Sequence, residues 1–333
     1  DIFQRDTKDM LGPGLDFPDM FGASAPQTNN ASMRNRGWEL SLNYRGKIGS
    51  DINYSIGGSL SDATAEVTEY ANPTGTNPAG NWYEGRKVGE IWGYRASGII
   101  QTQEEADEYN AKYNLSYLTG KAWEPGDVKY IDLNGDNKID RGDNNLNNMG
   151  DLTIIGNTTP RYQYTFNGSI SYKDLSLSMM FQGVAKRDWN PGTAPYFWGS
   201  GAYAQVTVFN EHMDYWREDN KDAYYPKPYI HSAGGVGPFR NKTMQTSDRY
   251  LQSGAYCRLK NITLSYNLPS TWVQKAGLQK VQVFFSGENL LTFTSLKGMF
   301  DPEAIFTSNS YTGEGGKNYP MNKVVSFGLV VNL

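Results

Sequence analysis

The stretch DLNGDNKIDRGD, residues 132–143, carries oxygen-bearing side chains at the spacing of a calcium-binding loop. In a calcium loop of the EF-hand kind, the ligands come from positions 1, 3, 5, 7, 9 and 12. Here these positions hold Asp132, Asn134, Asp136, Lys138, Asp140 and Asp143. Lysine at position 7 is compatible with binding because that position supplies only its backbone carbonyl. The spacing therefore predicts a calcium ion, and the position of the loop inside a long connection between strands predicts a structural rather than a catalytic role.

Two residues of this loop depart from the usual pattern. Asn137 stands where glycine is usual, although asparagine tolerates the left-handed backbone conformation. Asp143 is shorter than the usual glutamate, so it reaches the ion less easily with both oxygens. Ile139 is expected to point inward and anchor the loop. A metal-free turn held by its own Asp and Asn side chains is the alternative interpretation, and both stay open at this point.

Aromatic side chains form the second set with potential chemistry. The chain has 8 Trp, 23 Tyr and 14 Phe, and several lie in segments without strand-like alternation. Aromatic faces stack on sugar rings, and neighbouring polar side chains bind the hydroxyls. Packing between loops is the alternative role for such aromatic residues. The candidate substrate-binding residues are Trp82, Trp92, Trp189 and Trp198.

Catalytic centres and other metal sites find little support. The chain has two histidines, His212 and His231, and one cysteine, Cys257, which exclude a multi-cysteine zinc site and make a His-rich centre unexpected. No Ser–His–Asp set, phosphate-binding glycine loop or metal-hydrolase motif is visible, so no enzymatic activity is predicted. A pair of carboxylates like that of a glycosidase stays open. The net charge of −4 gives no indication of nucleic-acid binding.

Strands with alternating apolar and polar residues are expected to position these groups. With a partial strand at the N-terminus, the pattern predicts about eight strands and an all-β fold. Residues 99–114, IIQTQEEADEYNAKYN, predict one short helix between strands. The apolar rows lie within Trp38–Tyr44, Ile52–Leu60, Tyr162–Tyr172, Leu175–Phe181, Ile262–Tyr266, Val281–Phe285 and Val325–Leu333.

The connections between these strands alternate in length. Short connections lie near residues 46–51, 173–174 and 267–280, and long ones span about 11–34, 64–159, 185–254 and 292–322. Outer-membrane barrels have short periplasmic turns and long extracellular loops. Glu39, Arg45 and Gln163 stand between the apolar residues, and both faces of such strands cannot be buried in a dry core. A transmembrane antiparallel β-barrel, with outer-membrane lipid outside and a wet lumen inside, satisfies both faces.

Several stretches together carry a family resemblance. They are RDTKDMLGPG, NASMRNRGWELSLNYRG, GDVKYIDLNGDNKID, IGNTTPRYQYTFNGSISYKDLSLSMMFQGV, YCRLKNITLSYNLP, VFFSGENLLTFT and YPMNKVVSFGLVVNL. In combination they resemble the C-terminal part of the SusC/RagA family of TonB-dependent outer-membrane transporters of the Bacteroidetes. The resemblance runs over residues 1–333. The chain departs from the family at Leu333, where a terminal aromatic residue is favoured.

The resemblance implies import of a nutrient, an oligosaccharide or a peptide, across the bacterial outer membrane. It implies energy from the TonB complex and a SusD-like lipoprotein as an extracellular lid. Residues 1–333 would form about the last eight strands of a barrel of about 22 strands. A plug domain, the TonB-contacting segment and the earlier strands would precede Asp1. The alternative from another class is a soluble all-β module that contains calcium and binds or hydrolyses carbohydrate.

Overall fold

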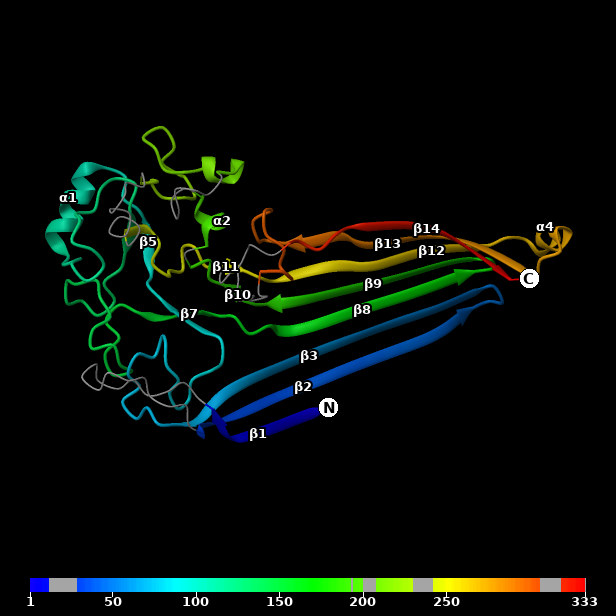
Figure 1. The fold of residues 1–333 in the computed structure, drawn as a ribbon, viewed down its shortest axis with the longest axis horizontal. Coiled ribbons are helices and arrows are strands. Elements are labelled where there is room, and N and C mark those ends of the chain that lie inside the picture. Colours follow the sequence, from blue (N-terminus) through cyan, green and yellow to red (C-terminus); the bar gives the residue numbers. More distant parts are fainter. Residues whose placement is uncertain (12–28, 193, 200–207, 230–241, 306–318, 333) are drawn as a thin grey trace.

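The computed structural model describes residues 1–11, 29–192, 194–199, 208–229, 242–305 and 319–332. Eight long antiparallel strands form one sheet in the order β1-β2-β3-β8-β9-β12-β13-β14 (Figure 1). Their bounds are Ile2–Leu11, Asn29–Ile48, Ile52–Tyr70, Arg161–Tyr172, Leu175–Lys186, Tyr256–Asn267, Lys280–Thr294 and Val324–Asn332. The predicted all-β fold is confirmed, and Leu333 lies outside the described residues. β1 and β14 each pair with a single neighbour, so the described sheet is open.

The connections are sorted between the two ends of the sheet, as the sequence predicts. At one end, here called the turn end, residues 49–51 and 173–174 form tight turns, and residues 268–279 carry α4 (Ser270–Val273) and the 3-10 helix η4 (Gln274–Ala276) (Figure 1). Gly49 and Lys173 take the left-handed conformation that these turns need, with φ of 62° and 51°. The described parts of the long connections lie at the opposite end, here called the loop end (Figure 1).

One face of the sheet is apolar across its strands. Residues paired across neighbouring strands lie on the same face, so the register shows which side chains share a face of the sheet. Tyr44 pairs with Ile56, Phe166 with Phe181, Leu177 with Leu264, and Phe285 with Phe327. Many of these side chains are exposed, including Tyr44 at 63% and Phe327 at 81%. The predicted alternation is therefore confirmed, and it leaves a broad apolar face uncovered by the described residues.

The opposite face is polar. Hydroxyl groups bond across it, with Ser59 at 2.6 Å from Thr165, Ser55 at 2.7 Å from Ser169, and Thr263 at 3.2 Å from Ser286. Gln163 pairs with Ser61, and Arg45 pairs with Ser55. The charged and amide side chains that interrupt the apolar rows therefore share one surface, here called the polar face.

The long connections contain short elements. The predicted helix is α1 (Gln103–Lys112), whose N-cap Thr102 accepts a hydrogen bond from the Glu105 N–H at 3.2 Å. Three small antiparallel pairs, β4–β7, β5–β6 and β10–β11, were not predicted, because segments this short show no alternation. The pairs are β4 (Glu90–Gly93) with β7 (Thr153–Asn157), β5 (Ala96–Ile99) with β6 (Val128–Tyr130), and β10 (Asp188–Trp189) with β11 (Gln252–Ser253). The remaining helices are α2 (Pro195–Trp198) and the 3-10 helix η3 (Asn210–Met213). Within the described ranges, none of the helices has the length and apolar character to cross a membrane.

Candidate functional site in the loop cluster

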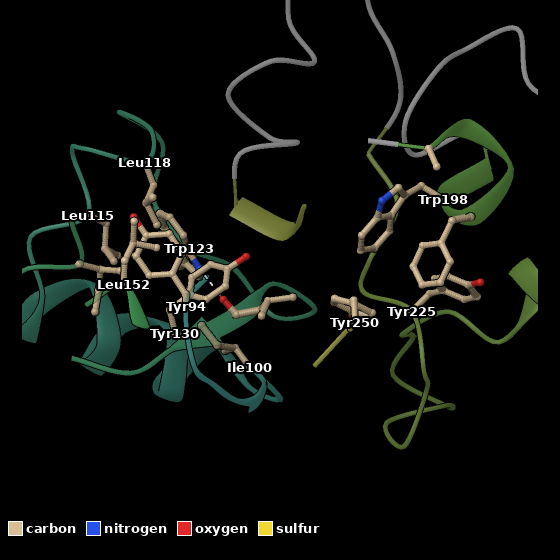
Figure 2. Close-up of a cluster of buried hydrophobic side chains, with 14 of the residues drawn as sticks. Tyr94, Ile100, Leu115, Leu118, Trp123, Tyr130, Leu152, Trp198, Tyr225 and Tyr250 are labelled. Atoms are coloured by element: carbon tan, nitrogen blue, oxygen red, sulfur yellow. Dashed lines mark hydrogen bonds between the residues drawn. The ribbon is translucent and has the colours of Figure 1, made fainter. Parts of the chain in front are cut away.

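The long connections pack around one hydrophobic cluster, here called the loop core. It joins the β3–β8 connection, with Tyr94, Trp123 and Tyr130, to the β9–β12 connection, with Trp198 and Tyr250. Figure 2 shows these two groups of side chains. The β13–β14 connection also contributes Leu296, Phe300 and Ile305. The described parts of three connections, far apart in sequence, therefore form one packed body at the loop end.

The predicted calcium loop is shaped by hydrogen bonds from its own backbone. Asp132 accepts the N–H of Gly135 at 2.7 Å with Oδ1 and that of Asn137 at 2.9 Å with Oδ2. Asn134 accepts the Asp136 N–H at 3.0 Å, and Asp136 accepts the Lys138 N–H at 2.9 Å. Asn137 has a φ of 59°, the left-handed conformation expected at its position. The first half of the segment thus forms a turn with a left-handed residue at position 6, where calcium loops usually have glycine.

The inner side of this segment is anchored. Ile139 is fully buried in the loop core, as predicted, and its N–H donates to the Asn114 carbonyl at 3.0 Å. Asp151, also fully buried, accepts the N–H of Leu133 at 2.7 Å and that of Asp140 at 3.0 Å. Burial raises the pKa of the Asp151 carboxyl, although these N–H groups act in the opposite direction. Sequence spacing missed Asp151 because it lies outside the motif.

The acidic side chains in the second half point to other partners. Asp140 accepts the Gly142 N–H at 2.6 Å, and Asp143 accepts the Asn148 side-chain amide at 3.0 Å. Over the described part of the chain, no group of three or more His, Cys, Asp or Glu side chains is gathered in a way that could hold a metal ion. Asp140 and Asp143 therefore have protein partners in this structure, and both calcium binding and the metal-free turn stay open.

The four candidate tryptophans pack against other protein side chains. Trp189 is 5% exposed and Trp198 is 7% exposed, both within the loop core. Trp198 also donates its Nε1–H to the Gly192 carbonyl at 2.7 Å. Trp92 packs partly buried against the same core, whereas Trp82 packs against a separate small cluster with Tyr70. These contacts match the packing alternative, and substrate binding by the four residues stays a prediction.

A buried ion pair joins two of the long connections. Lys242 Nζ lies 2.9 Å from Asp127 Oδ2, and both side chains are fully buried. The Tyr229 hydroxyl donates to Asp127 Oδ1, and the Glu124 N–H donates to Oδ2 at 2.8 Å. Burial raises the pKa of Asp127, although Lys242 acts in the opposite direction. The partners are 115 residues apart in sequence, so no local pattern could have predicted the pair.

The polar face is covered at the loop end. Val67, Val184 and Tyr256 lie on this face according to the register, yet they are only 1%, 7% and 9% exposed. Towards the turn end, polar residues such as Asn43 and Asn53 remain exposed. The long connections therefore cover the loop end of the polar face.

A cavity of about 570 Å³ lies where β3 and β8 separate beyond the Ser61–Gln163 pair. Its lining carries both charge signs: Lys87 and Lys186 are positive, and Glu90 and Asp188 are negative. Arg161, also in the lining, pairs with Asp62. Such a lining suits a polar ligand better than an apolar one.

No family model matches the chain. Among curated proteins, the chain is 28% identical to TonB-dependent receptor P3 of Formosa agariphila over an alignment of 348 residues. This alignment covers 99% of the chain and 31% of the relative. TonB-dependent receptor P26 of the same organism is 24% identical, with 99% of the chain and 32% of the relative covered.

Solved structures give the same picture for the fold. The structure of the RagAB peptide transporter matches 100% of the chain with a TM-score of 0.65 and 21% identity, over 33% of its own chain. The RagAB peptide importer in the 'open-open' state matches with a TM-score of 0.64 and 22% identity. The chain thus spans about a third of the length of the proteins that it matches. These comparisons confirm the predicted resemblance: over nearly its whole length the chain is a homologue of TonB-dependent receptors, with the fold of a part of the SusC/RagA-type transporter.

Proposed function

We propose that residues 1–333 form part of the β-barrel of a TonB-dependent importer in the bacterial outer membrane. The observation that carries this proposal is the two-faced sheet, apolar on one side and polar on the other, with the described parts of the long connections at one end. That combination fits strands with lipid outside and a wet lumen inside. The remaining barrel strands, to a total of about 22, and the plug would belong to other parts of the full-length protein.

The apolar face also argues against the soluble alternative. Leu42, Tyr44 and Phe327 are 66%, 63% and 81% exposed. Burying one large apolar side chain is worth about 1.5–3 kcal/mol, so a soluble module would lose this amount at many positions. Contact with outer-membrane lipid removes the penalty, because lipid takes the place of water along the whole face.

The cargo that we propose is an oligosaccharide or a peptide. The RagAB relatives are named as a peptide transporter and importer, which supports the peptide. We expect a SusD-like lipoprotein to cover the loop end, and the TonB complex to act through a segment outside this chain. The packed loop core supports the first expectation, because it gives a lid a structured surface to rest on.

Calcium at residues 132–143 remains part of the proposal. The left-handed Asn137 and the buried Ile139 give the loop its shape before any ion binds. Asp132, Asn134, Asp136, Asp140 and the Lys138 carbonyl would supply the oxygen ligands, and Asp143 would have to leave Asn148 to join them. The ion would stiffen the β3–β8 connection.

Uptake measurements test the proposed function. Cells with and without the full-length protein are given labelled oligosaccharides and labelled peptides, and uptake is measured with TonB present and with TonB deleted. We expect uptake of one cargo class to require both the protein and TonB. Uptake that is unchanged without the protein would refute import, and glycan binding by residues 1–333 folded alone in water would favour the soluble alternative.

A further inference from the structure

Arg258 occupies an unusual position on the polar face of the sheet. It lies on β12 opposite Gln182, which pairs with Thr165, so its side chain belongs to the polar face. An arginine on a polar sheet face normally keeps its charged guanidinium in water, yet this side chain is only 2% exposed. Burial of a charge is costly without partners, so something must both cover the guanidinium and neutralise it.

The β13–β14 connection supplies the partners. Arg258 Nη2 lies 2.8 Å from Asp301 Oδ2, and Nη1 lies 3.3 Å from Glu303 Oε1. Within the sheet, Nε donates to the Thr292 hydroxyl at 2.9 Å. Lys260 adds a second cation, 3.1 Å from Glu303 Oε2. Two cations of β12 therefore hold two carboxylates of one connection.

Asp301 joins three parts of the chain. Its Oδ1 accepts the Glu303 N–H at 2.9 Å, and its Oδ2 accepts the Met321 N–H at 3.1 Å in addition to the Arg258 contact. Met321 lies just ahead of β14, so both described ends of the connection meet at this carboxylate. Burial acts to raise the pKa of Asp301, but these N–H and guanidinium donors bring it below its usual value. The carboxylate is therefore charged at neutral pH.

The far side of this segment is fixed by apolar packing. Leu296, Phe300 and Ile305 are buried in the loop core, and the Phe300 ring lies 5.0 Å from that of Trp189. Residues 296–305, here called the strap, thus lie between the polar face and the loop core.

We propose that Arg258 is a positioning residue that fixes the strap across the loop end of the polar face, where it covers part of the import route. The inference rests on the proposed function in one respect, because only an importer gives the polar face a passing cargo. The ion pair suits this role because hydrophobic packing alone would hold the strap to the loop core but not to the polar face of the sheet. Release of the strap from the wall then requires that the Arg258–Asp301 contact open.

A cysteine-labelling experiment on the full-length protein in outer-membrane vesicles tests the fixing role. The background carries Cys257→Ser and Ala304→Cys, which leaves the strap thiol as the single cysteine of residues 1–333, and any cysteine in the rest of the full-length protein is replaced by serine. A hydrophilic maleimide then reports how often the strap leaves its position. In this background we expect Arg258→Gln to increase the labelling rate about 10-fold or more, since loss of one partner of a buried pair is strongly destabilising. Arg258→Lys keeps the charge and should give a smaller increase.

The matched control is Arg217→Gln, which removes an ion pair with the exposed Asp219 in another connection. It should leave labelling unchanged. Asp301→Asn tests the contact from the strap side and replaces Arg258→Gln if that variant fails to assemble. Equal labelling in Arg258→Gln, Asp301→Asn and the unsubstituted background would overturn the proposal. Labelling does not depend on TonB or cargo, so it decides the fixing role even if uptake measurements refute the proposed function.

Discussion

Trp189 provides a sharp test of whether the loop aromatics are packing residues or ligand-binding residues. The side chain is 5% exposed, and its ring lies 5.0 Å from Phe300 and 6.1 Å from Phe197. Replacing a buried tryptophan with alanine costs about 3–5 kcal/mol. This cost falls on the loop core, because Trp189 belongs to the two-residue strand β10 and not to the main sheet. The equilibrium constant for local opening should rise by roughly 100- to 5,000-fold in Trp189→Ala.

Hydrogen exchange with mass spectrometry on the full-length protein in vesicles measures this opening. Peptides from residues 123–130 and 250–253 should lose protection, whereas peptides from β8 and β9 should keep it. Tyr117→Ala is the control, because Tyr117 is 54% exposed and its removal leaves the core packed. Unchanged protection in Trp189→Ala, together with weaker cargo binding, would refute the packing role and favour a ligand-binding one.

Three further outcomes are expected. Phe166→Arg should hinder barrel assembly by about 2–4 kcal/mol while Gln163→Arg is tolerated, and equal amounts of heat-modifiable barrel on gels would contradict the assignment of faces. Removal of calcium, either by Asp132→Ala combined with Asp136→Ala or by EDTA on the unsubstituted protein, should increase protease cleavage near residues 103–114, and magnesium should restore protection poorly. Crystals grown in calcium that show only water in the loop would contradict the calcium site. Deletion of residues 190–200 should weaken co-purification of the lipoprotein lid and leave the barrel assembled, and unchanged co-purification would place the lid contact on other loops.

The sheet was predictable from sequence because each strand places apolar residues on one face of the sheet and polar residues on the other. The apolar rows at Tyr44, Phe166 and Leu177 repeat every second residue, and the structure places them on one face. Strand starts were less predictable. β2 begins at Asn29, ahead of the predicted row at Trp38, because the intervening residues do not alternate and pair through their backbone.

The loop cluster was predictable only where the information is local. Spacing within residues 132–143 led to the turn geometry and to the inward Ile139. Residue type alone did not reveal that Trp189 is buried, since exposure depends on chain segments far away in sequence. Asp127 and Lys242 belong to different connections, and their pairing appears only once both connections fold onto the loop core.

Solvent accessibility of spin labels along β9 tests the central claim most directly. Nitroxides at Leu177, Ser178, Met179 and Met180 of the full-length protein in vesicles are compared for collisions with oxygen, which concentrates in lipid, and with a water-soluble nickel chelate. A membrane-spanning wall predicts high oxygen and low nickel accessibility at Leu177 and Met179, whose side chains share the apolar face. Ser178 and Met180, on the polar face, should show the lower oxygen accessibility. High nickel accessibility at Leu177 and Met179 would mean that the apolar face meets water, which would contradict the proposed membrane location.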